Sequence, residues 1–394
     1  MFWLTIILTL RKKQTPKTTI SEGFSMSRIK SLYVHFPFCT KFCPYCDYPK
    51  TLYDKDLIDP YFKSLSFDLE SMDIDKNSLT TIYFGGGTPN ALPLAKLLSF
   101  SKEVSKYLNK KEEYEWTIEM NPELVTEEYL IAIKKTGINR ISLGVQTFND
   151  TQLLLLGRKI TEKEAIQKIQ LVKKHFDNYS IDLIYGLPKD ERDTLIDNLK
   201  IAQRLRIPHL SFYPLTIHEN TPYFKLGVQE LSEENYALFT TTINHVLFGY
   251  RYKHYEITNY ALSKEKFGRH NSVYWTGDEY FAIGLGAHGY VKSVRYHKSD
   301  NMQSYLENPI KRYDERKINK KERIEEFFLL NLRTSMGISY SLFRERFGQD
   351  IPRKVLARIN QPKTKEMLLI TNDGFSVREE YFSILDHIVL KIIG

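Results

Sequence analysis

The chain has 394 residues, a net charge of +8 and a hydrophobic share of 42%. That share excludes wholesale disorder, and the length allows one large α/β domain with a smaller appended one. Acidic residues alternate with basic ones, as in KKEEYE at residues 110–115, so we expect a mixed surface and no nucleic-acid partner. All three cysteines lie between residues 39 and 46, which excludes a disulfide framework.

The N-terminus carries an apolar run, FWLTIILTL, followed by Arg11, Lys12 and Lys13. This run is too short to span a bilayer, which takes about 20 residues, and a signal peptide would carry its charges before the apolar run. Met26 opens a segment typical of a cytosolic start. We therefore interpret residues 1–25 as an extension from a mis-called start and expect a cytosolic protein. A weak anchor at a membrane surface is the alternative.

From residue 31 onward, short β-branched and aromatic runs alternate with amphipathic stretches in which apolar residues recur every three or four positions. Such alternation predicts a parallel sheet with helices packed outside it. Six units of this kind favour an α/β fold, a partial (βα)6 TIM-like barrel, which we assign to residues 26–294. The predicted strands are residues 31–36, 80–85, 114–120, 139–145, 179–185 and 209–215, and the clearest helices are 59–72, 91–108 and 161–176.

The C-terminal third has a different pattern. Residues 295–324 are polar and highly charged, and we expect them to form an irregular connection. Residues 325–394 predict two helices, a hairpin turning at Asn372, Asp373 and Gly374, and a final helix. This is a small α+β, winged-helix-like domain, and its mixed charge favours a packing role over DNA binding.

Cys39, Cys43 and Cys46 have the spacing CxxxCxxC on a loop after the first strand. Two metal centres fit three converging thiolates. A structural zinc wants four ligands, for which His35 is the nearest fourth candidate. A four-iron cluster can be held by three cysteines, with one iron left for another ligand. The missing fourth cysteine favours an iron that coordinates a small molecule.

Polar groups follow the ends of the other predicted strands. GGGTPN (85–90) follows the second strand, and Glu119, Gln146 and Asp182 lie at or near the ends of the next three. In parallel α/β sheets and barrels, ligands bind at the carboxyl ends of the strands. Glycines there let a backbone approach a ligand. We therefore expect one ligand site at this rim, beside the thiols.

Several motifs carry a family resemblance: YVHFPFCTKFCPYCDY, YFGGGTPN, IEMNPE, GINRISLGVQTFND, SIDLIYGLP and RHNSVYW. Over residues 31–290 the chain resembles radical S-adenosylmethionine (SAM) proteins, and it is most similar to the oxygen-independent coproporphyrinogen III oxidase family and its heme-chaperone branch, HemW. The resemblance implies a 4Fe-4S cluster on the three cysteines, with SAM on the open iron. Whether one or two SAM molecules bind stays open. The family motifs assign to the cofactor pocket Tyr33, Tyr45, Gly86, Gly87, Thr88, Glu119, Gln146, Arg158 and Asp182.

RHNSVYW resembles the HNxxYW signature of the chaperone branch. The resemblance makes His270 a candidate axial ligand of heme, with Asn271 and Tyr274 orienting it or covering the porphyrin. His288 is a second candidate. A single loop histidine more often makes local hydrogen bonds, so a purely structural role is the alternative.

The oxidases usually carry a further cysteine two positions after the third, where this chain has Tyr48. This departure favours a heme chaperone that delivers heme to respiratory-chain proteins. The alternatives are oxidative decarboxylation of coproporphyrinogen III and, from another class, a zinc-binding structural module. The client protein, the electron donor, the use of a homodimer and contact with the membrane stay open.

Overall fold

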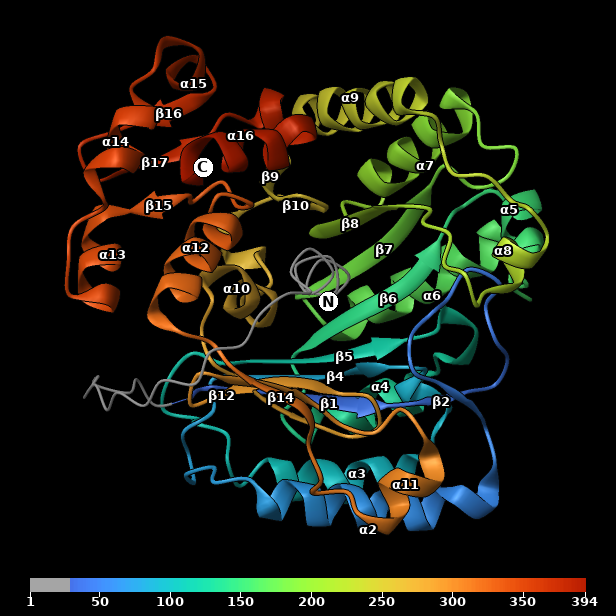
Figure 1. Cartoon of the computed structure of the whole chain (residues 1–394). Coiled ribbons are helices and arrows are strands. Elements are labelled where there is room, and N and C mark those ends of the chain that lie inside the picture. The colour runs from blue at the N-terminus through green and yellow to red at the C-terminus, as the bar shows by residue number, and fades with distance from the viewer. Residues whose placement is uncertain (1–28) are drawn as a thin grey trace.

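A computed structural model describes residues 29–394 (Figure 1). The expectation for residues 1–25 lies outside the described residues. The centre of the molecule is a nine-stranded sheet in the order β11-β1-β4-β5-β6-β7-β8-β10-β9. Its neighbours are parallel from β11 to β8, and β10 and β9 add antiparallel pairs. The bounds are β1 Ser31–Phe36, β4 Thr81–Gly86, β5 Glu115–Met120, β6 Arg140–Gln146, β7 Tyr179–Tyr185, β8 His209–Pro214, β9 Lys253–Glu256, β10 Asn259–Ala261 and β11 Phe281–Ile283.

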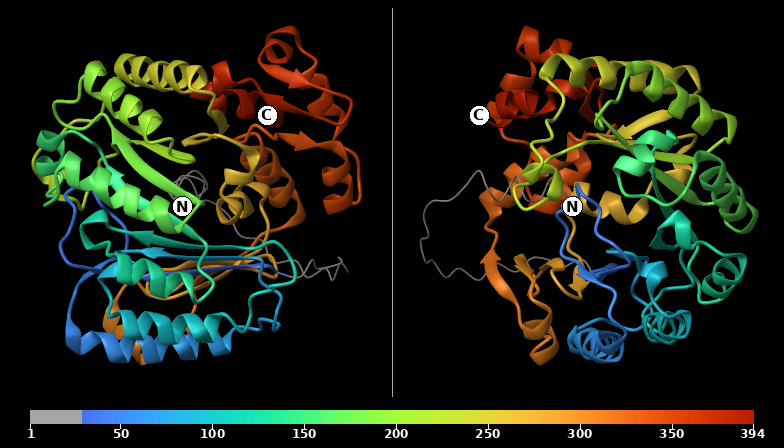
Figure 2. Two further views of the ribbon diagram at one scale, coloured as in Figure 1. Left: turned by 180° about the vertical axis from the view of Figure 1, so that it is seen from behind. Right: turned by 90° about the vertical axis from the view of Figure 1, so that its right-hand side faces the viewer.

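Helices cover the outer face of this curved sheet (Figures 1 and 2), which confirms the predicted partial barrel. Phe84 on β4 packs in the same core as Phe100 on the helix that follows it. Side chains alternate along each strand, so the opposite face points inward, and it carries polar groups such as Glu119 and Asp182. The helices are α2 Lys55–Ser71, α3 Leu94–Val104, α4 Glu127–Lys134, α5 Asp150–Leu155, α6 Glu162–His175, α7 Arg192–Arg204, α8 Pro222–Lys225 and α9 Glu233–Gly249.

The expectation of an irregular connection at residues 295–324 is wrong. Most of this segment is regular: β13 and β14 pair antiparallel with a helix between them, and β12, which precedes the segment, completes a sheet in the order β12-β13-β14. β13 and β14 are four and five residues long and carry charged residues on partly exposed faces, so they leave no apolar period in the sequence. The elements are β12 His288–Val291, β13 Val294–His297, α11 Met302–Glu307 and β14 Tyr313–Lys317.

A buried ion pair ties this small sheet to the barrel. The Nζ of Lys298 lies 2.6 Å from Oδ1 of Asp68 on α2, and both side chains are 0% exposed. Lys298 also donates to the carbonyl of Pro309 at 3.0 Å. The other carboxylate oxygen of Asp68 accepts from the hydroxyl of Tyr305 at 3.1 Å and from the backbone N–H of Gly284 at 3.2 Å. The pair is therefore satisfied on both sides, as buried charges must be.

The C-terminal residues form an α+β domain with its own core, which includes Phe327, Phe328 and Phe343. The predicted hairpin and the final helix are present, but four helices precede the hairpin instead of two. The sheet has the order β15-β17-β16. The elements are α12 Lys320–Asn331, β15 Ile338–Ser339, α13 Tyr340–Phe347, α14 Arg353–Ile359, α15 Pro362–Glu366, β16 Leu368–Ile370, β17 Gly374–Val377 and α16 Leu385–Ile393.

Helix α10, Arg269–Thr276, lies between the barrel and this domain (Figures 1 and 2). Arg346 on α13 donates to the carbonyl of Thr276, at the end of α10. The N–H of Ser335 also donates to the carbonyl of Tyr255 on β9 at 2.9 Å. The segment that carries the HNxxYW signature is therefore packed on both sides.

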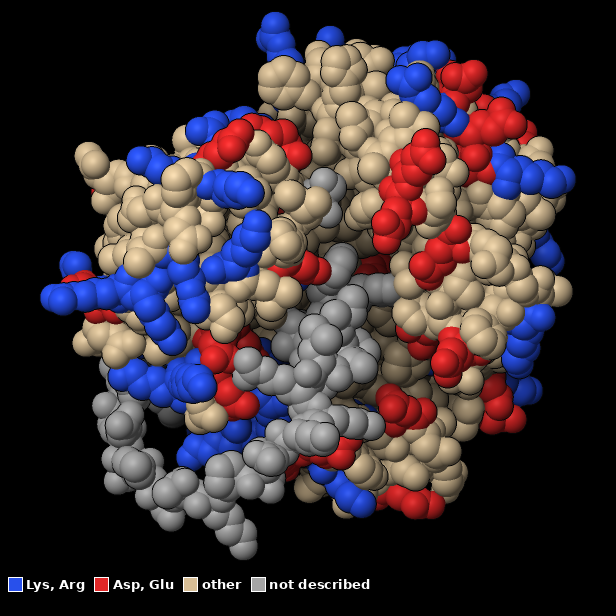
Figure 3. All heavy atoms as spheres, turned by 45° about the horizontal axis from the view of Figure 1, so that its top comes forward, with Lys and Arg blue, Asp and Glu red and all other residues tan. Residues whose placement is uncertain are grey.

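Acidic and basic side chains both occur over the face drawn in Figure 3, in agreement with the mixed charge pattern of the sequence. None of the helices formed by residues 29–394 has the length and apolar character needed to cross a bilayer.

Candidate cofactor site at the carboxyl ends of the strands

The three thiols lie on a loop at the carboxyl end of β1. Cys39 ends the short strand β2, Phe38–Cys39, which pairs in parallel with β3, Thr51–Leu52, and so closes the loop that contains Cys43 and Cys46. The N–H of Cys46 donates to the carbonyl of Cys43 at 3.3 Å. Burial raises the pKa of Cys39 to about 11 and also raises that of Cys46, and the neighbouring thiols add to both shifts. A cation would be needed to hold these groups as thiolates.

In the conformation described for residues 29–394, no three His, Cys, Asp or Glu side chains are grouped closely enough to hold an ion. The thiols are neighbours on one loop, and they would have to converge further around a cluster.

The glycine loop after β4 lies directly against this cysteine loop. The N–H of Gly87 donates to the carbonyl of Phe36 at 2.7 Å, and the N–H of Thr88 donates to the carbonyl of Phe38 at 2.8 Å. The Oγ1 of Thr88 lies 3.7 Å from Sγ of Cys39. A Cβ at Gly87 would lie 2.7 Å from the backbone of Pro37, so only glycine allows this approach.

Glu119 at the end of β5 holds the same loop from the other side. Its Oε2 accepts from the N–H of Gly86 at 2.9 Å, and its Oε1 accepts from the hydroxyl of Tyr83 at 2.7 Å. Burial raises the pKa of Glu119, and these two hydrogen bonds oppose that shift. Tyr83 was not predicted as a site residue, because an aromatic residue inside a strand is typical of core. Side chains alternate along a strand, and the next residue, Phe84, points outward, so this alternation would have placed Tyr83 on the inner face.

Gln146 and Asp182 lie on the inner face of the next two strands. Gln146 ends β6 with a φ of 74°, and its amide folds back so that a Cβ at Gly144 would lie 2.7 Å from Nε2. The Oδ2 of Asp182 accepts from the hydroxyl of Ser142 at 3.0 Å. Burial raises the pKa of Asp182. The position suits a carboxylate that accepts from hydroxyl groups of a ligand.

Arg158 follows α5 and is buried, yet its Nε has no hydrogen-bond partner among the described residues. Tyr45, from the cysteine loop, lies close enough to Arg158 and to the thiol of Cys43 to interact electrostatically with both. A Cβ at Gly144 would lie 3.8 Å from Nη2 of Arg158, so the guanidinium lies close to the strand that carries Gln146. A buried guanidinium N–H without a partner fits an anionic group of a ligand, such as the carboxylate of an amino acid.

Neither ring nitrogen of His35 is free to bind a metal ion beside the thiols. Its Nδ1 lies 2.9 Å from the hydroxyl of Tyr33, and its Nε2 lies 2.8 Å from the carbonyl of Pro49. Burial lowers its pKa to about 4. The ring also backs the glycine loop, because a Cβ at Gly86 would lie 2.5 Å from it. Both nitrogens are used in structural contacts, which argues against a zinc site that includes His35.

The HNxxYW signature lies toward the other end of the inner face. His270 is buried, with Nδ1 3.0 Å from the hydroxyl of Thr81 and Nε2 2.9 Å from the hydroxyl of Tyr274. Burial lowers the pKa of His270 to about 3. Asn271 donates to the carboxylate of Glu256. In this conformation His270 offers no free nitrogen to a ligand. His288 is exposed and stacks on His297, with 5.3 Å between ring centroids.

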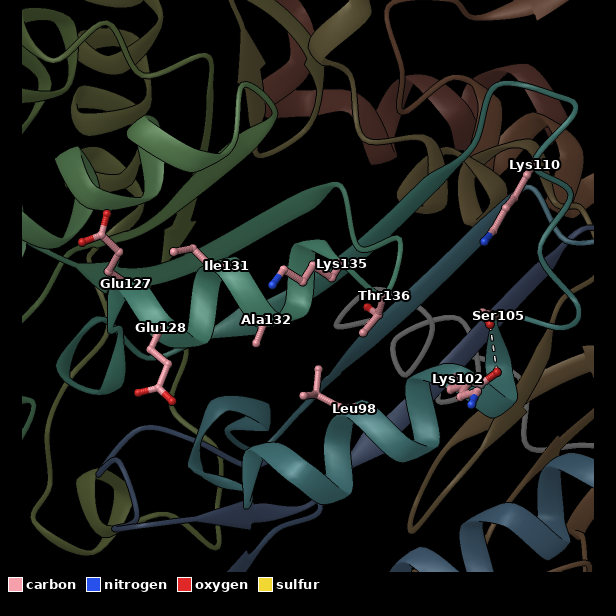
Figure 4. A pocket seen from close by; sticks show the side chains of 10 residues that line it. All are labelled: Leu98, Lys102, Ser105, Lys110, Glu127, Glu128, Ile131, Ala132, Lys135 and Thr136. Atoms are coloured by element: carbon pink, nitrogen blue, oxygen red, sulfur yellow. Dashed lines mark hydrogen bonds between the residues drawn. The ribbon is translucent and has the colours of Figure 1, made fainter.

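A groove of about 860 Å³ lies between α3 and α4 on the outer layer of helices (Figure 4). Leu98, Ile131 and Ala132 give it an apolar floor, and lysine and glutamate side chains form its rim. None of the predicted site residues lines this groove, so it is separate from the rim that carries the thiols.

Two family models match this chain. The model of the Radical SAM superfamily matches residues 33–221, and that of the HemN C-terminal domain matches residues 318–380. Among solved structures, coproporphyrinogen III oxidase HemN from Escherichia coli aligns with a TM-score of 0.78, covers 93% of this chain and 90% of its own, and is 18% identical. That likeness shows a shared fold.

Two curated relatives are closer in sequence. The heme chaperone HemW of Lactococcus lactis is 33% identical over 91% of this chain and 97% of its own length. The heme chaperone HemW of Bacillus subtilis is 30% identical over 82% of this chain and 88% of its own length. On this evidence the chain belongs to the HemW family of the radical SAM superfamily.

Proposed function

We propose that this protein is a heme chaperone that holds a 4Fe-4S cluster, binds SAM beside it, takes up heme and passes it to respiratory-chain proteins. The observation that supports this most directly is the single group of thiols, on a loop that is hydrogen-bonded to the glycine loop after β4. The Lactococcus lactis relative that is named a heme chaperone covers 91% of this chain, and the model of the HemN C-terminal domain matches residues 318–380. A cytosolic location with visits to a membrane-bound client suits this role.

Cys39, Cys43 and Cys46 would hold the cluster. When bound, such a cluster supplies a low-potential electron and one iron with an open coordination site. Gly86 and Gly87 leave room for the methionine part of SAM, and the guanidinium of Arg158 suits its carboxylate. Glu119 and Asp182 accept hydrogen bonds on the inner face and suit the ammonium and the ribose hydroxyls. We assign Tyr33 and Tyr45 to the same pocket.

Ligation of heme iron would require different changes at His270, which is buried, and at His288, which is exposed. Iron ligation by His270 requires the ring to release Thr81 or Tyr274, so α10 would have to move from the inner face. We propose that heme contact belongs to this helix, because Tyr274 and Asn271 border the same ring. Ligation by His288 would require no such movement, since that side chain is exposed.

The decisive experiment is anaerobic reconstitution with iron and sulfide, followed by titration with SAM and with heme. We expect about four irons and four sulfides per wild-type chain. A triple variant, Cys39→Ala, Cys43→Ala, Cys46→Ala, should bind neither iron nor SAM. His270→Ala should weaken heme binding and change its absorption spectrum, whereas His288→Ala should change neither.

Three outcomes would contradict the proposal. Zinc at one ion per chain, with no sulfide, would indicate the structural module. Conversion of coproporphyrinogen III to protoporphyrinogen IX in the presence of SAM would indicate the oxidase. Unchanged heme binding in His270→Ala, together with loss in His288→Ala, would move the heme site to the exposed histidine.

A further inference from the structure

Helix α10 is held on the barrel chiefly by polar contacts. Of its eight residues, Arg269–Thr276, only His270 is buried. Val273 and Tyr274 are partly buried against a small core cluster. A helix with so little buried apolar surface gains little from packing, and segments of this kind open at a low cost in free energy. The position of His270 therefore depends on the groups that hydrogen-bond to the helix.

Two buried carboxylates of the barrel bind the N-terminal end of α10. Glu115, the first residue of β5, accepts from the backbone N–H groups of Arg269 and His270, each at 2.9 Å. The first N–H groups of a helix have no partner within it, and the helix dipole also favours a negative charge there. Glu256, the last residue of β9, accepts from the side-chain amide of Asn271. Both glutamates are buried, so water competes little with these contacts.

The C-terminal end of α10 is attached to the other domain. Arg346 on α13 donates to the carbonyl of Thr276 and to the carboxylate of Asp278. Gly268 precedes the helix, and Gly277 ends it in the left-handed conformation, with a φ of 71°. Hinges form at a few residues, often small ones, that absorb a change in the backbone. This arrangement suits a swing of the N-terminal end of α10 about a fixed C-terminal end.

We propose that Glu115 and Glu256 are positioning residues that hold α10 closed against the sheet, so that heme reaches His270 only when these contacts break. This inference rests on the proposed function, because it takes His270 as the heme contact. In the closed position the Nδ1 of His270 faces Thr81 and its Nε2 faces Tyr274. The glutamates act through the helix and do not touch the heme. The measured association constant for heme is then that of the open form multiplied by the fraction of molecules that are open.

The test is titration of the reconstituted full chain with hemin at pH 8.5, followed by absorption spectroscopy. Burial raises the pKa of Glu256 to about 7, so its carboxylate is mostly ionised at that pH. Glu256→Gln should raise the heme affinity about fivefold, because a neutral acceptor forms weaker hydrogen bonds than a carboxylate. Glu115→Gln should raise it further, since the amide nitrogen would face one of the two helix N–H groups. Adding His270→Ala to either variant should abolish the gain, and the spectrum of bound heme in the single variants should remain that of the wild type.

A second measurement separates this role from a general effect on the fold. Amide hydrogen exchange without heme should be faster at residues 270–276 in both glutamate variants than in the wild type. Glu164→Gln is the matched control, because Glu164 accepts from the N–H of Thr161 at the start of α6, at 2.8 Å. It should change neither the heme affinity nor the exchange of α10. Damage to the fold alone would lower the heme affinity, whereas release of α10 raises it.

The outcomes are separable. If His270→Ala binds heme as the wild type does, the proposed heme site fails. If His270→Ala loses heme, but Glu256→Gln binds it no more tightly than the wild type, the positioning role is refuted while the function stands. A gain that persists when His270→Ala is added, or a gain without faster exchange of α10, would refute it as well. Arg140 lies 3.9 Å from Glu115, so Glu115→Gln leaves a buried charge. If that variant does not fold, Glu256→Gln decides alone.

Discussion

The N–H of Gly86 donates to the carboxylate of Glu119 over 2.9 Å, so the end of one strand holds the loop that follows its neighbour. The second oxygen of that carboxylate is held by Tyr83. The glycine loop in turn hydrogen-bonds to the backbone of the cysteine segment. The cysteine segment, the glycine loop and β5 are therefore positioned relative to one another by hydrogen bonds within the protein before any ligand arrives.

Glu119→Gln should lower the affinity for SAM about tenfold or more, because hydrogen bonds to a charged acceptor are worth about 1.5–3 kcal/mol. The cluster content should remain that of the wild type, since the thiols are untouched. Calorimetric titration of the reconstituted protein measures the affinity. Glu345→Gln, on an exposed helix of the C-terminal domain, is the control. An unchanged affinity in Glu119→Gln would show that the carboxylate does not serve the ligand.

Gly86→Ala should abolish SAM binding and destabilise the fold. The backbone at Gly86 has a φ of 114°, and the added Cβ would lie 2.5 Å from the ring of His35. Gly249→Ala provides a matched control, because nothing lies within 4 Å of that Cβ at the end of α9. Thermal unfolding and SAM titration of both variants check the prediction. A Gly86→Ala protein as stable as the control would disprove the close packing of the loop on His35.

Lys298→Met should cost about 3–5 kcal/mol in the free energy of unfolding, because it leaves the buried carboxylate of Asp68 without its cation. The double variant Lys298→Met, Asp68→Leu should recover part of that loss. In contrast, Lys200→Met removes the exposed pair with Asp197 and should cost less than about 1 kcal/mol. Urea unfolding of the four proteins gives these values. Equal losses in the single and double variants would mean that the unpaired carboxylate of Asp68 is not the cause of the loss.

Acid should destabilise the protein through its buried histidines. Burial lowers the pKa of His35 and His254 to about 4 and that of His270 to about 3, from an ordinary 6.5. Below pH 6.5 these histidines become protonated in the unfolded chain but stay neutral in the folded chain. The free energy of unfolding therefore falls as the pH drops toward their folded-state pKa values. Glu256, whose pKa burial raises to about 7, opposes this trend between its ordinary pKa of 4.5 and 7.

The measurement is chemical unfolding at a series of pH values from 7 to 4. His254→Gln should flatten the decline by about 1.4 kcal/mol for each pKa unit of the shift that it removes. His245→Gln, at an exposed position on α9, is the control variant. A wild-type stability that rises on acidification would show that Glu256 and the other carboxyls whose pKa burial raises, such as Glu119, Asp182 and Asp190, outweigh the histidines.

The sequence could predict β1, β4, β5, β6, β7 and β8 and the rim where they end, because buried parallel strands leave long β-branched runs and parallel strands end on one side. It could not predict β11, which has three residues, or β13, whose alternate side chains are charged and half exposed. A strand so short is specified by its neighbours rather than by its own pattern.

The environment of His270 could not be predicted from the sequence for a related reason. Its partner Thr81 lies 189 positions away along the chain, and only the packing of α10 on the sheet brings them together. By contrast, the approach of Gly86 to Glu119 could be anticipated from the order of adjacent strands. Residues whose partners come from neighbouring βα units are predictable in this fold, and those that meet distant segments are not.

Strand β11 pairs in parallel with β1, so that Leu32 lies opposite Phe281. This pairing has a consequence for biosynthesis. While the ribosome is making the barrel, the backbone N–H and C=O groups on one edge of β1 have no hydrogen-bond partner. They gain one only when Phe281 to Ile283 emerge. An open strand edge recruits strands from other nascent chains. Cells that make this protein quickly would therefore need to shield the growing chain, or to slow translation, until the last third has been added.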